Sequence, residues 1–180
     1  MAPSVRADRE SLPYRDCAAA AVFNAEGKVF IGRRMAEPGD DQSEVEAPWQ
    51  MPQGGIDPGE DPLTAARREV YEETNISSLE LLAEAPEWLF YDLPEDAIGV
   101  ALKGKYRGQR QRWFAFAFVG DESEIDLARP GGGGYHAEFD AWRWEDLAQT
   151  PQLIVPFKRD VYRQVAAAFA DLPRRLRAGL

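Results

Sequence analysis

Residues 54–76 read GGIDPGEDPLTAARREVYEETNI, and this stretch decides the fold. A loop with three glycines leads into a helix predicted over Pro62–Thr74. Asp61 is a good N-cap, and Pro62 stands at the first helical position, where its missing N–H costs nothing. Asn75 can end the helix in the left-handed conformation. The apolar stripe at helical spacing consists of Leu63, Ala66 and Val70.

Three glutamates crowd one face of this helix beside the apolar stripe. Glu69, Glu72 and Glu73 stand at i, i+3 and i+4 and therefore lie within about 100° of arc. Like charges at this spacing destabilise a bare helix by a few tenths of a kcal/mol per pair, so the pattern invites a cation. Carboxylate oxygens suit Mg²⁺ or Mn²⁺. For three glutamates alone, a solvated acidic helix face is the competing interpretation.

The loop and helix together resemble the Nudix box, G-x5-E-x7-REU-x-EE-x-GU, where U is an aliphatic residue. The matching positions are Gly54, Glu60, Arg68, Glu69, Val70, Glu72, Glu73 and Ile76. Asn75 replaces the family's last glycine, and asparagine tolerates the same left-handed backbone. The resemblance implies an α/β Nudix fold, with a mixed β-sheet sandwiched between α-helices. It also implies a metal-dependent hydrolase in which water attacks phosphorus in a phosphoanhydride.

Segments outside the box resemble one branch of this family, the bacterial RNA 5′-pyrophosphohydrolases, also described as dinucleoside polyphosphate hydrolases. These segments are Tyr14-Arg15, WQMPQGGID (49–57), YDLP (91–94), GQRQRWF (108–114), EFDAWRW (138–144) and VPFKRDVY (155–162). The chain departs from the branch at Asp16, where the family has proline, and at Phe90, where arginine often stands. The loop Met35–Pro48 is also longer than in the best-known members.

The resemblance assigns roles to residues of this chain by position. The expected catalytic residues are Arg68, Glu69, Glu72, Glu73 and Glu138. The expected ligands of Mg²⁺ or Mn²⁺ are Glu60, Glu69, Glu72, Glu73 and Glu138. The expected substrate contacts are Arg15, Arg34, Gly54, Gly55, Tyr91, Val155, Phe157 and Lys158. Simpler alternatives stay open: Phe157 and Tyr91 could be core residues, and Glu138, Arg15 and Arg34 could be ordinary surface charges.

The charge of the chain is concentrated in one window. The net charge is −10, and residues 37–73 hold eleven acidic and two basic side chains. Taken alone, this acidity argues against binding of a polyanion. Four of these acids, however, belong to the proposed metal site, so binding of a polyphosphate should depend steeply on divalent cations. A basic cluster at 103–112 is either a contact for a phosphate chain or a solvated loop.

The resemblance to this branch implies that the substrate is an RNA 5′-triphosphate or diphosphate end, cleaved to a 5′-monophosphate in a step that initiates RNA decay. A dinucleoside polyphosphate such as diadenosine tetraphosphate is the close second, because both offer a base, a ribose and a phosphate chain. Two further readings are a non-catalytic nucleotide-sensing module and a hydrolase of damaged nucleoside triphosphates. The complete glutamate set disfavours the first, and the resemblance outside the box disfavours the second.

The remaining sequence predicts one domain over 14–172, between a flexible N-terminal segment (1–13) and a C-terminal tail (173–180). Strands are expected at 17–23, 28–34, 49–51, 79–83, 87–93, 112–119 and 139–144, with Pro52–Gly55 as a break and a closing helix at 157–172. No apolar run reaches the roughly 18–20 residues that span a bilayer. A single cysteine fits a reducing compartment, so a cytoplasmic location is expected, with no membrane contact and no evident obligate protein partner.

Overall fold

The computed structural model describes residues 8–35 and 48–180. Its strands are β1 (Tyr14–Phe23), β2 (Val29–Arg34), β3 (Trp49–Gln50), β4 (Gln53–Gly55), β5 (Leu79–Glu84), β6 (Leu89–Asp92), β7 (Gly108–Phe118) and β8 (Phe139–Glu145). Its α-helices are α1 (Pro62–Thr74), α2 (Thr150–Leu153), α3 (Arg159–Ala168) and α4 (Leu172–Arg177). None of the helices in these ranges is long and apolar enough to cross a membrane.

The strands form one mixed sheet, as the sequence predicts. Its central path runs β3-β2-β1-β7-β5, while β4 pairs with β1, β6 with β7 and β8 with β2. β1 and β7 run parallel over ten residue pairs, from Tyr14–Gly108 to Phe23–Ala117, and the other pairings are antiparallel. The parallel pair forms the middle of the sheet, where alanines on β1 leave room for large side chains on its neighbours.

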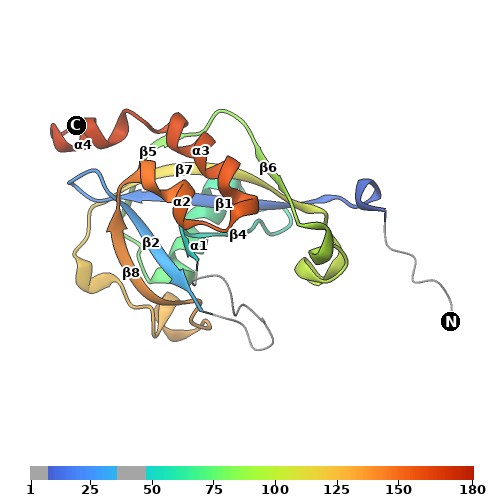
Figure 1. Ribbon diagram of the computed structural model, residues 1–180. Helices are drawn as coiled ribbons and strands as arrows, with labels where there is room; N and C mark the ends of the chain where they lie inside the picture. Colours follow the sequence, from blue (N-terminus) through green and yellow to red (C-terminus); the bar gives the residue numbers. More distant parts are fainter. Residues whose placement is uncertain (1–7, 36–47) are drawn as a thin grey trace, which may run out of the picture.

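Helices cover both faces of the sheet, so the expected α/β/α sandwich is confirmed (Figure 1). On one face, Ala66 and Val70 of α1 are fully buried against alternate residues of β1 and β7. On the other face, Val161 and Val165 of α3 pack against the opposite set, which includes Trp113. β1 therefore lies between the two helices. Successive side chains near its N-terminal end point alternately to the two faces of the sheet.

The boundaries of α1 agree with its local signals. The Asp61 carboxylate accepts a hydrogen bond of 3.1 Å from the Thr64 backbone N–H, and Pro62 occupies the first turn. Asn75 ends the helix with φ 69° and ψ 3°, in the left-handed region. These caps are determined within the segment itself, which is why the sequence predicts both ends of α1 correctly.

Several boundary predictions are wrong. β1 begins at Tyr14 rather than at residue 17, because Tyr14–Asp16 pair with β7. Pro52–Gly55 is not only a break, because Gln53–Gly55 forms β4 and pairs with Cys17–Ala19 of β1. The closing helix does not begin at Phe157: a 3₁₀ turn spans Pro156–Lys158, and α3 begins at Arg159 and ends at Ala168. The aromatic strand is longer than expected, since β7 begins at Gly108 rather than 112. In each case, pairing or packing with distant residues overrides the local pattern.

Two expected segments lie wholly or partly outside the described residues: most of the N-terminal segment, residues 1–7, and the loop residues 36–47. Within the described part of the first segment, Arg9–Ser11 forms a 3₁₀ turn, and Arg9 Nη2 donates to the Leu93 carbonyl over 2.9 Å. The expected C-terminal tail contains α4.

Candidate active site

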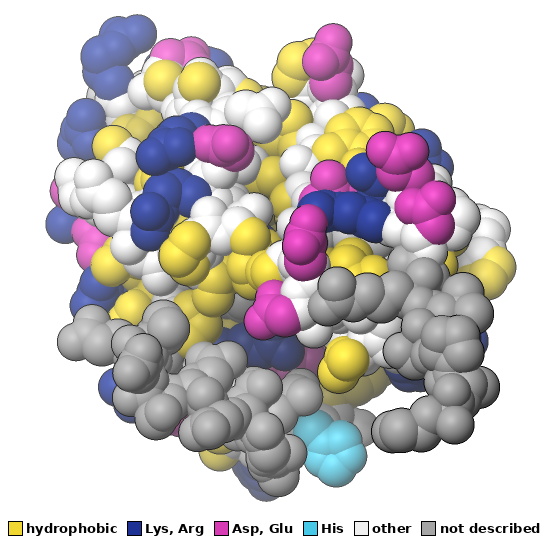
Figure 2. Space-filling model, turned by 45° about the vertical axis from the view of Figure 1, so that its right-hand side comes forward, with side chains coloured by type: hydrophobic (Ala, Val, Ile, Leu, Met, Phe, Trp, Pro, Cys, Tyr) yellow, Lys and Arg dark blue, Asp and Glu magenta, His cyan; other side chains and the backbone are white. Residues whose placement is uncertain are grey.

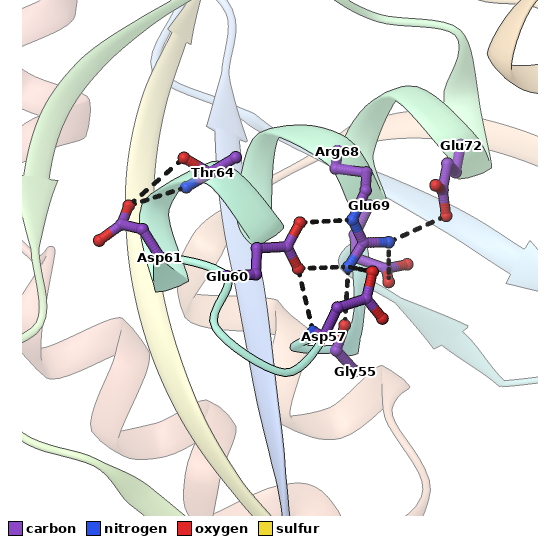
Figure 3. A network of polar contacts seen from close by, with 8 residues as sticks. All are labelled: Gly55, Asp57, Glu60, Asp61, Thr64, Arg68, Glu69 and Glu72. Atoms are coloured by element: carbon purple, nitrogen blue, oxygen red, sulfur yellow. Dashed lines mark hydrogen bonds and ion pairs between the residues drawn. The ribbon is translucent and has the colours of Figure 1, made fainter.

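Arg68 is the centre of a network of carboxylates on α1 and the loop before it (Figure 3). Its Nε and Nη2 donate to the two oxygens of Glu60, each over 2.8 Å. Its Nη1 donates to Glu69 over 2.8 Å and to Glu72 over 3.1 Å. Nη2 also donates to the Gly55 carbonyl over 2.8 Å. One guanidinium therefore fixes the glycine loop to the helix and orients three glutamates.

These contacts shift the proton affinities of both partners. The Arg68 guanidinium lowers the pKa of the Glu60 carboxyl below its ordinary value, and the Glu60 carboxylate raises the pKa of Arg68 in return. Figure 2 shows a face of the molecule on which acidic side chains gather around basic ones beside exposed hydrophobic surface. Bidentate arginine–carboxylate pairs of this kind set orientation as well as charge.

Glu73 is the buried member of the glutamate set, and Glu69 is partly buried. Glu73 is 3% exposed; the Gln53 backbone N–H donates to its carboxylate, and its Oε2 has no hydrogen-bond partner. Burial raises the pKa of Glu73 well above its ordinary value, and the charges of Glu138 and Glu69 add to that rise. Burial likewise raises the pKa of Glu69 to about 7. Two carboxylates at this depth need a positive partner to stay ionised.

Glu138 comes from outside the helix. It stands directly before β8, and its charge raises the pKa of both Glu69 and Glu73. The structure therefore brings this residue into electrostatic range of the α1 carboxylates, as the family position implies. Tyr135, in the preceding loop, hydrogen-bonds Glu72 through its hydroxyl. No feature of the sequence singled out this tyrosine.

The donor chemistry fits a divalent cation. Glu73 Oε2 is a buried anionic oxygen without a partner, and hard oxygen ligands of this type are those that Mg²⁺ and Mn²⁺ prefer. Across residues 8–35 and 48–180, no three acidic, histidine or cysteine side chains are already arranged as metal ligands. In this arrangement Glu69 and Glu72 each direct one carboxylate oxygen toward Arg68, and Glu60 directs both.

Gly54 and Gly55 make room for two side chains of opposite charge. A Cβ on Gly54 would lie within 2.2 Å of Glu69 Oε2, and a Cβ on Gly55 would lie 2.4 Å from Arg15 Nη2. Both glycines belong to β4, so this short strand is what carries the loop so close to the helix. A side chain at either position would displace a charged group from the site.

A cavity of about 410 Å³ opens beside this strand. Its lining residues are Tyr14, Arg15, Asp16, Gly55, Ile56, Asp57, Arg68, Glu69 and Tyr106. The cavity thus joins the Arg68 network to the N-terminal end of β1. Asp16, Asp57 and Tyr106 were not expected from the sequence as site residues. Their spacing along the chain gives no signal, because only the pairing of β1 with β4 and β7 brings them together.

A second group of expected residues lies at the start of α3. The Phe157 ring is 39% exposed and lies 5.6 Å from the ring of Tyr91, which is 7% exposed. Lys158 Nζ lies 5.2 Å from the Tyr91 ring centroid. Burial, together with the nearby charge of Arg34, lowers the pKa of Lys158 to about 8. Val155 is half-buried and accepts a hydrogen bond from the Lys158 backbone.

Electrostatic contacts connect this group to the carboxylates. Burial raises the pKa of Tyr91, and the charges of Arg15 and Arg34 partly offset that rise. The charge of Glu73 likewise offsets part of the fall in the pKa of Lys158 that burial causes. A half-exposed ring, a buried cation and two arginines therefore lie within electrostatic range of the site carboxylates, and Arg15 lines the same cavity as Arg68 and Glu69. The arrangement can accept an aromatic group and an anion next to a set of carboxylates that can hold a cation.

Comparison with known proteins agrees with this geometry. The NUDIX domain model matches residues 13–165. The RNA pyrophosphohydrolase of Mesorhizobium japonicum is 55% identical over 174 residues, covering 97% of this chain and all of that protein. The RNA pyrophosphohydrolase of Brucella ovis is 58% identical over 165 residues, 92% of each chain.

Solved structures resemble the fold at lower identity. A C. elegans Ap4A hydrolase complex superposes with a TM-score of 0.56 at 21% identity, covering 87% of this chain and 98% of that one. The E. coli dihydroneopterin triphosphate pyrophosphohydrolase has a TM-score of 0.59 at 19% identity, covering 84% and 96%. Divalent metals are in general use among Nudix hydrolases. The chain belongs to the Nudix family.

Proposed function

We propose that this protein removes phosphates from the 5′ end of triphosphorylated or diphosphorylated RNA. Water would add across the phosphoanhydride bond, leaving an RNA 5′-monophosphate and releasing pyrophosphate or phosphate. The observation that carries the proposal is the identity of 55–58%, over more than nine-tenths of the chain, to proteins named RNA pyrophosphohydrolase. The site supplies what such a substrate needs: carboxylates for cations, and a ring with cations for a nucleotide.

The carboxylates of α1 and Glu138 would hold Mg²⁺ or Mn²⁺. The metal ions would neutralise the phosphate chain and make an attacking water more acidic. Glu69, Glu72, Glu73 and Glu138 offer the ligand oxygens, and Glu60 keeps Arg68 in place while they turn to the cation. Arg68 thus acts through the glutamates as a positioning residue.

The nucleotide would lie against the residues at the start of α3. The exposed part of Phe157 can stack on a base, which is worth roughly 1–3 kcal/mol and tolerates any base. Arg15, Arg34 and Lys158 would contact phosphates, and Gly54 and Gly55 would let the phosphate chain approach the β4 backbone. These groups would also accept a dinucleoside polyphosphate, so that substrate is the second candidate.

A direct comparison of substrates tests the proposal. We expect kcat/KM for a short 5′-triphosphate RNA to exceed that for diadenosine tetraphosphate, with Mg²⁺ present in both assays. A larger value for diadenosine tetraphosphate would assign the main activity to that substrate. No turnover of either substrate by folded protein would favour a nucleotide-sensing module, and turnover in excess EDTA would remove the metal from the proposal.

A further inference from the structure

The sheet carries a partly exposed aromatic–arginine face, formed by Tyr14, Trp88, Phe90, Arg110 and Arg112. The strand register places these residues together: Arg110 lies opposite Asp16 on β1 and opposite Phe90 on β6. Directly paired residues point to the same side of a sheet, as do residues two apart along a strand. All five side chains therefore lie on one face. It is the face that α1 covers further along, over Ala18 and Phe114.

α1 stops short of this region, so the face is open. Phe90 is 48% exposed, and the side chains of Arg110 and Asp16 are 40% and 44% exposed. In Figure 1, β1 continues past α1 toward its N-terminal end, and β7 lies between β1 and β6 in the sheet. The other face of the same strands is closed, because Leu89, Gln109 and Gln111 are buried there.

The exposed rings and guanidinium groups are stacked on one another. The Tyr14 and Phe90 rings meet edge-to-face at 5.1 Å. The guanidinium carbons of Arg110 and Arg112 lie 4.5 and 5.7 Å from the Trp88 ring centroid. Arg110 also pairs with Asp16, and Arg112 with Glu84, whose side chain is 46% exposed. The Arg110–Asp16 pair is exposed at both ends, and such ion pairs are weak, so a phosphate can compete for Arg110. The Arg112 side chain is only 17% exposed and stays with Trp88 and Glu84.

The aromatic–arginine face is continuous with the active-site cavity. Tyr14 and Asp16 belong to the lining of that cavity together with Glu69 and Arg68. A ligand whose phosphates reach the α1 carboxylates can therefore extend across Tyr14 onto β7 and β6. The three strands lie about 4.8 Å apart, so the face offers several stacking positions rather than one.

We propose that the aromatic–arginine face binds single-stranded RNA that follows the 5′ end of the substrate. Bases would stack on Trp88, Phe90 and Tyr14, and Arg110 would contact a phosphate, while Arg112 holds the Trp88 ring. Aromatic side chains on the open face of a sheet are a common means of holding unpaired RNA. The inference rests on the proposed function and deepens it, because a diadenosine tetraphosphate has no polynucleotide to occupy such a face.

Binding measured by fluorescence anisotropy tests this inference without relying on turnover. The probes are a 5′-monophosphorylated dinucleotide and an unstructured 5′-monophosphorylated oligoribonucleotide of about eight nucleotides, within the usual range of single-strand sites. The proteins are the wild type, Trp88→Ala, Phe90→Ala and Trp88→Phe. Val119→Ala is the matched control, because Val119 is 56% exposed but follows the opposite end of β7.

We expect the wild type to bind the longer RNA more tightly than the dinucleotide. Trp88→Ala and Phe90→Ala should each weaken binding of the longer RNA by about five- to hundred-fold and change dinucleotide binding by less than about twofold. Trp88→Phe should restore most of the affinity, and Val119→Ala should leave it unchanged. Hydrolysis of diadenosine tetraphosphate should be equal in all variants, which also shows that each variant is folded.

Equal affinity of the wild type for the two probes would overturn the inference, as would wild-type affinity in both alanine variants. Either result would indicate that the aromatic–arginine face binds a protein partner and not RNA. Failure of the proposed function is distinguishable, because it would appear as absent pyrophosphate release from triphosphorylated RNA by the wild type, whatever the length dependence of binding.

Discussion

Replacing Asn75 with alanine puts a residue that disfavours the left-handed conformation at the end of α1. The same change removes two hydrogen bonds. Asn75 ends α1 with φ 69°. Its Nδ2 donates to the Glu124 carbonyl over 3.0 Å, and its Oδ1 accepts from the Gly132 backbone N–H over 2.9 Å. The side chain thus ties the end of the glutamate helix to two loops that follow it far along the chain.

The expected loss of folding stability can be worked out from these contacts. Each hydrogen bond contributes about 1 kcal/mol net, and a left-handed alanine costs roughly 1–2 kcal/mol. We expect Asn75→Ala to lower the free energy of unfolding by about 3–4 kcal/mol. Asn75→Gly loses the same hydrogen bonds but accepts the backbone, so about 2 kcal/mol is expected. Asn75→Asp keeps the acceptor for Gly132 and loses only the donor to Glu124.

Urea denaturation of the three variants measures these differences, provided that the m-values agree. In a domain of this size, each kcal/mol also lowers Tm by about 2–4 °C. Equal stability of the alanine and glycine variants would refute the backbone component. A loss below about 0.5 kcal/mol in the glycine variant would refute the role of the two hydrogen bonds.

Three substitutions probe the active site. Arg68→Lys should lower kcat by at least about tenfold with less change in KM, because a lysine cannot hold Glu60 with a bidentate fork; an unchanged kcat would contradict the positioning role. Glu72→Gln should lower turnover by at least about 100-fold in folded protein, and near-normal rates would exclude it as a metal ligand. Phe157→Ala should raise KM with little change in Tm, since its ring is 39% exposed; a large fall in Tm would instead show that Phe157 belongs to the core.

The predictable part of the fold is the part set by neighbouring residues. Asp61, Pro62 and Asn75 define α1 locally, and its apolar stripe fixes which face is buried. The sequence does not predict β4, because two adjacent glycines are typical of a break between strands. Its strand conformation depends instead on pairing with Cys17–Ala19, more than thirty residues earlier in the chain.

The candidate site also has a part that the sequence predicts and a part that depends on the fold. The glutamates of α1 are identifiable from their spacing and their family positions, and the structure places Glu138 within electrostatic range of them. The sequence does not indicate that Arg68 hydrogen-bonds four residues, since these partners range from the neighbouring Glu69 to Gly55. Nor does the sequence indicate that Tyr14 and Phe90 meet, because the sheet register alone brings their rings together.

We propose that Glu73, with the partly buried Glu69 and Glu72 of α1, binds the divalent cation on which phosphate binding depends. Calorimetric titration of Mn²⁺ into the wild type and into Glu73→Gln tests it most directly, without substrate. Glutamine keeps an acceptor for the Gln53 backbone N–H, so the variant should stay folded. We predict that Mn²⁺ affinity falls by at least about tenfold in Glu73→Gln. Equal affinity of the two folded proteins would contradict the account.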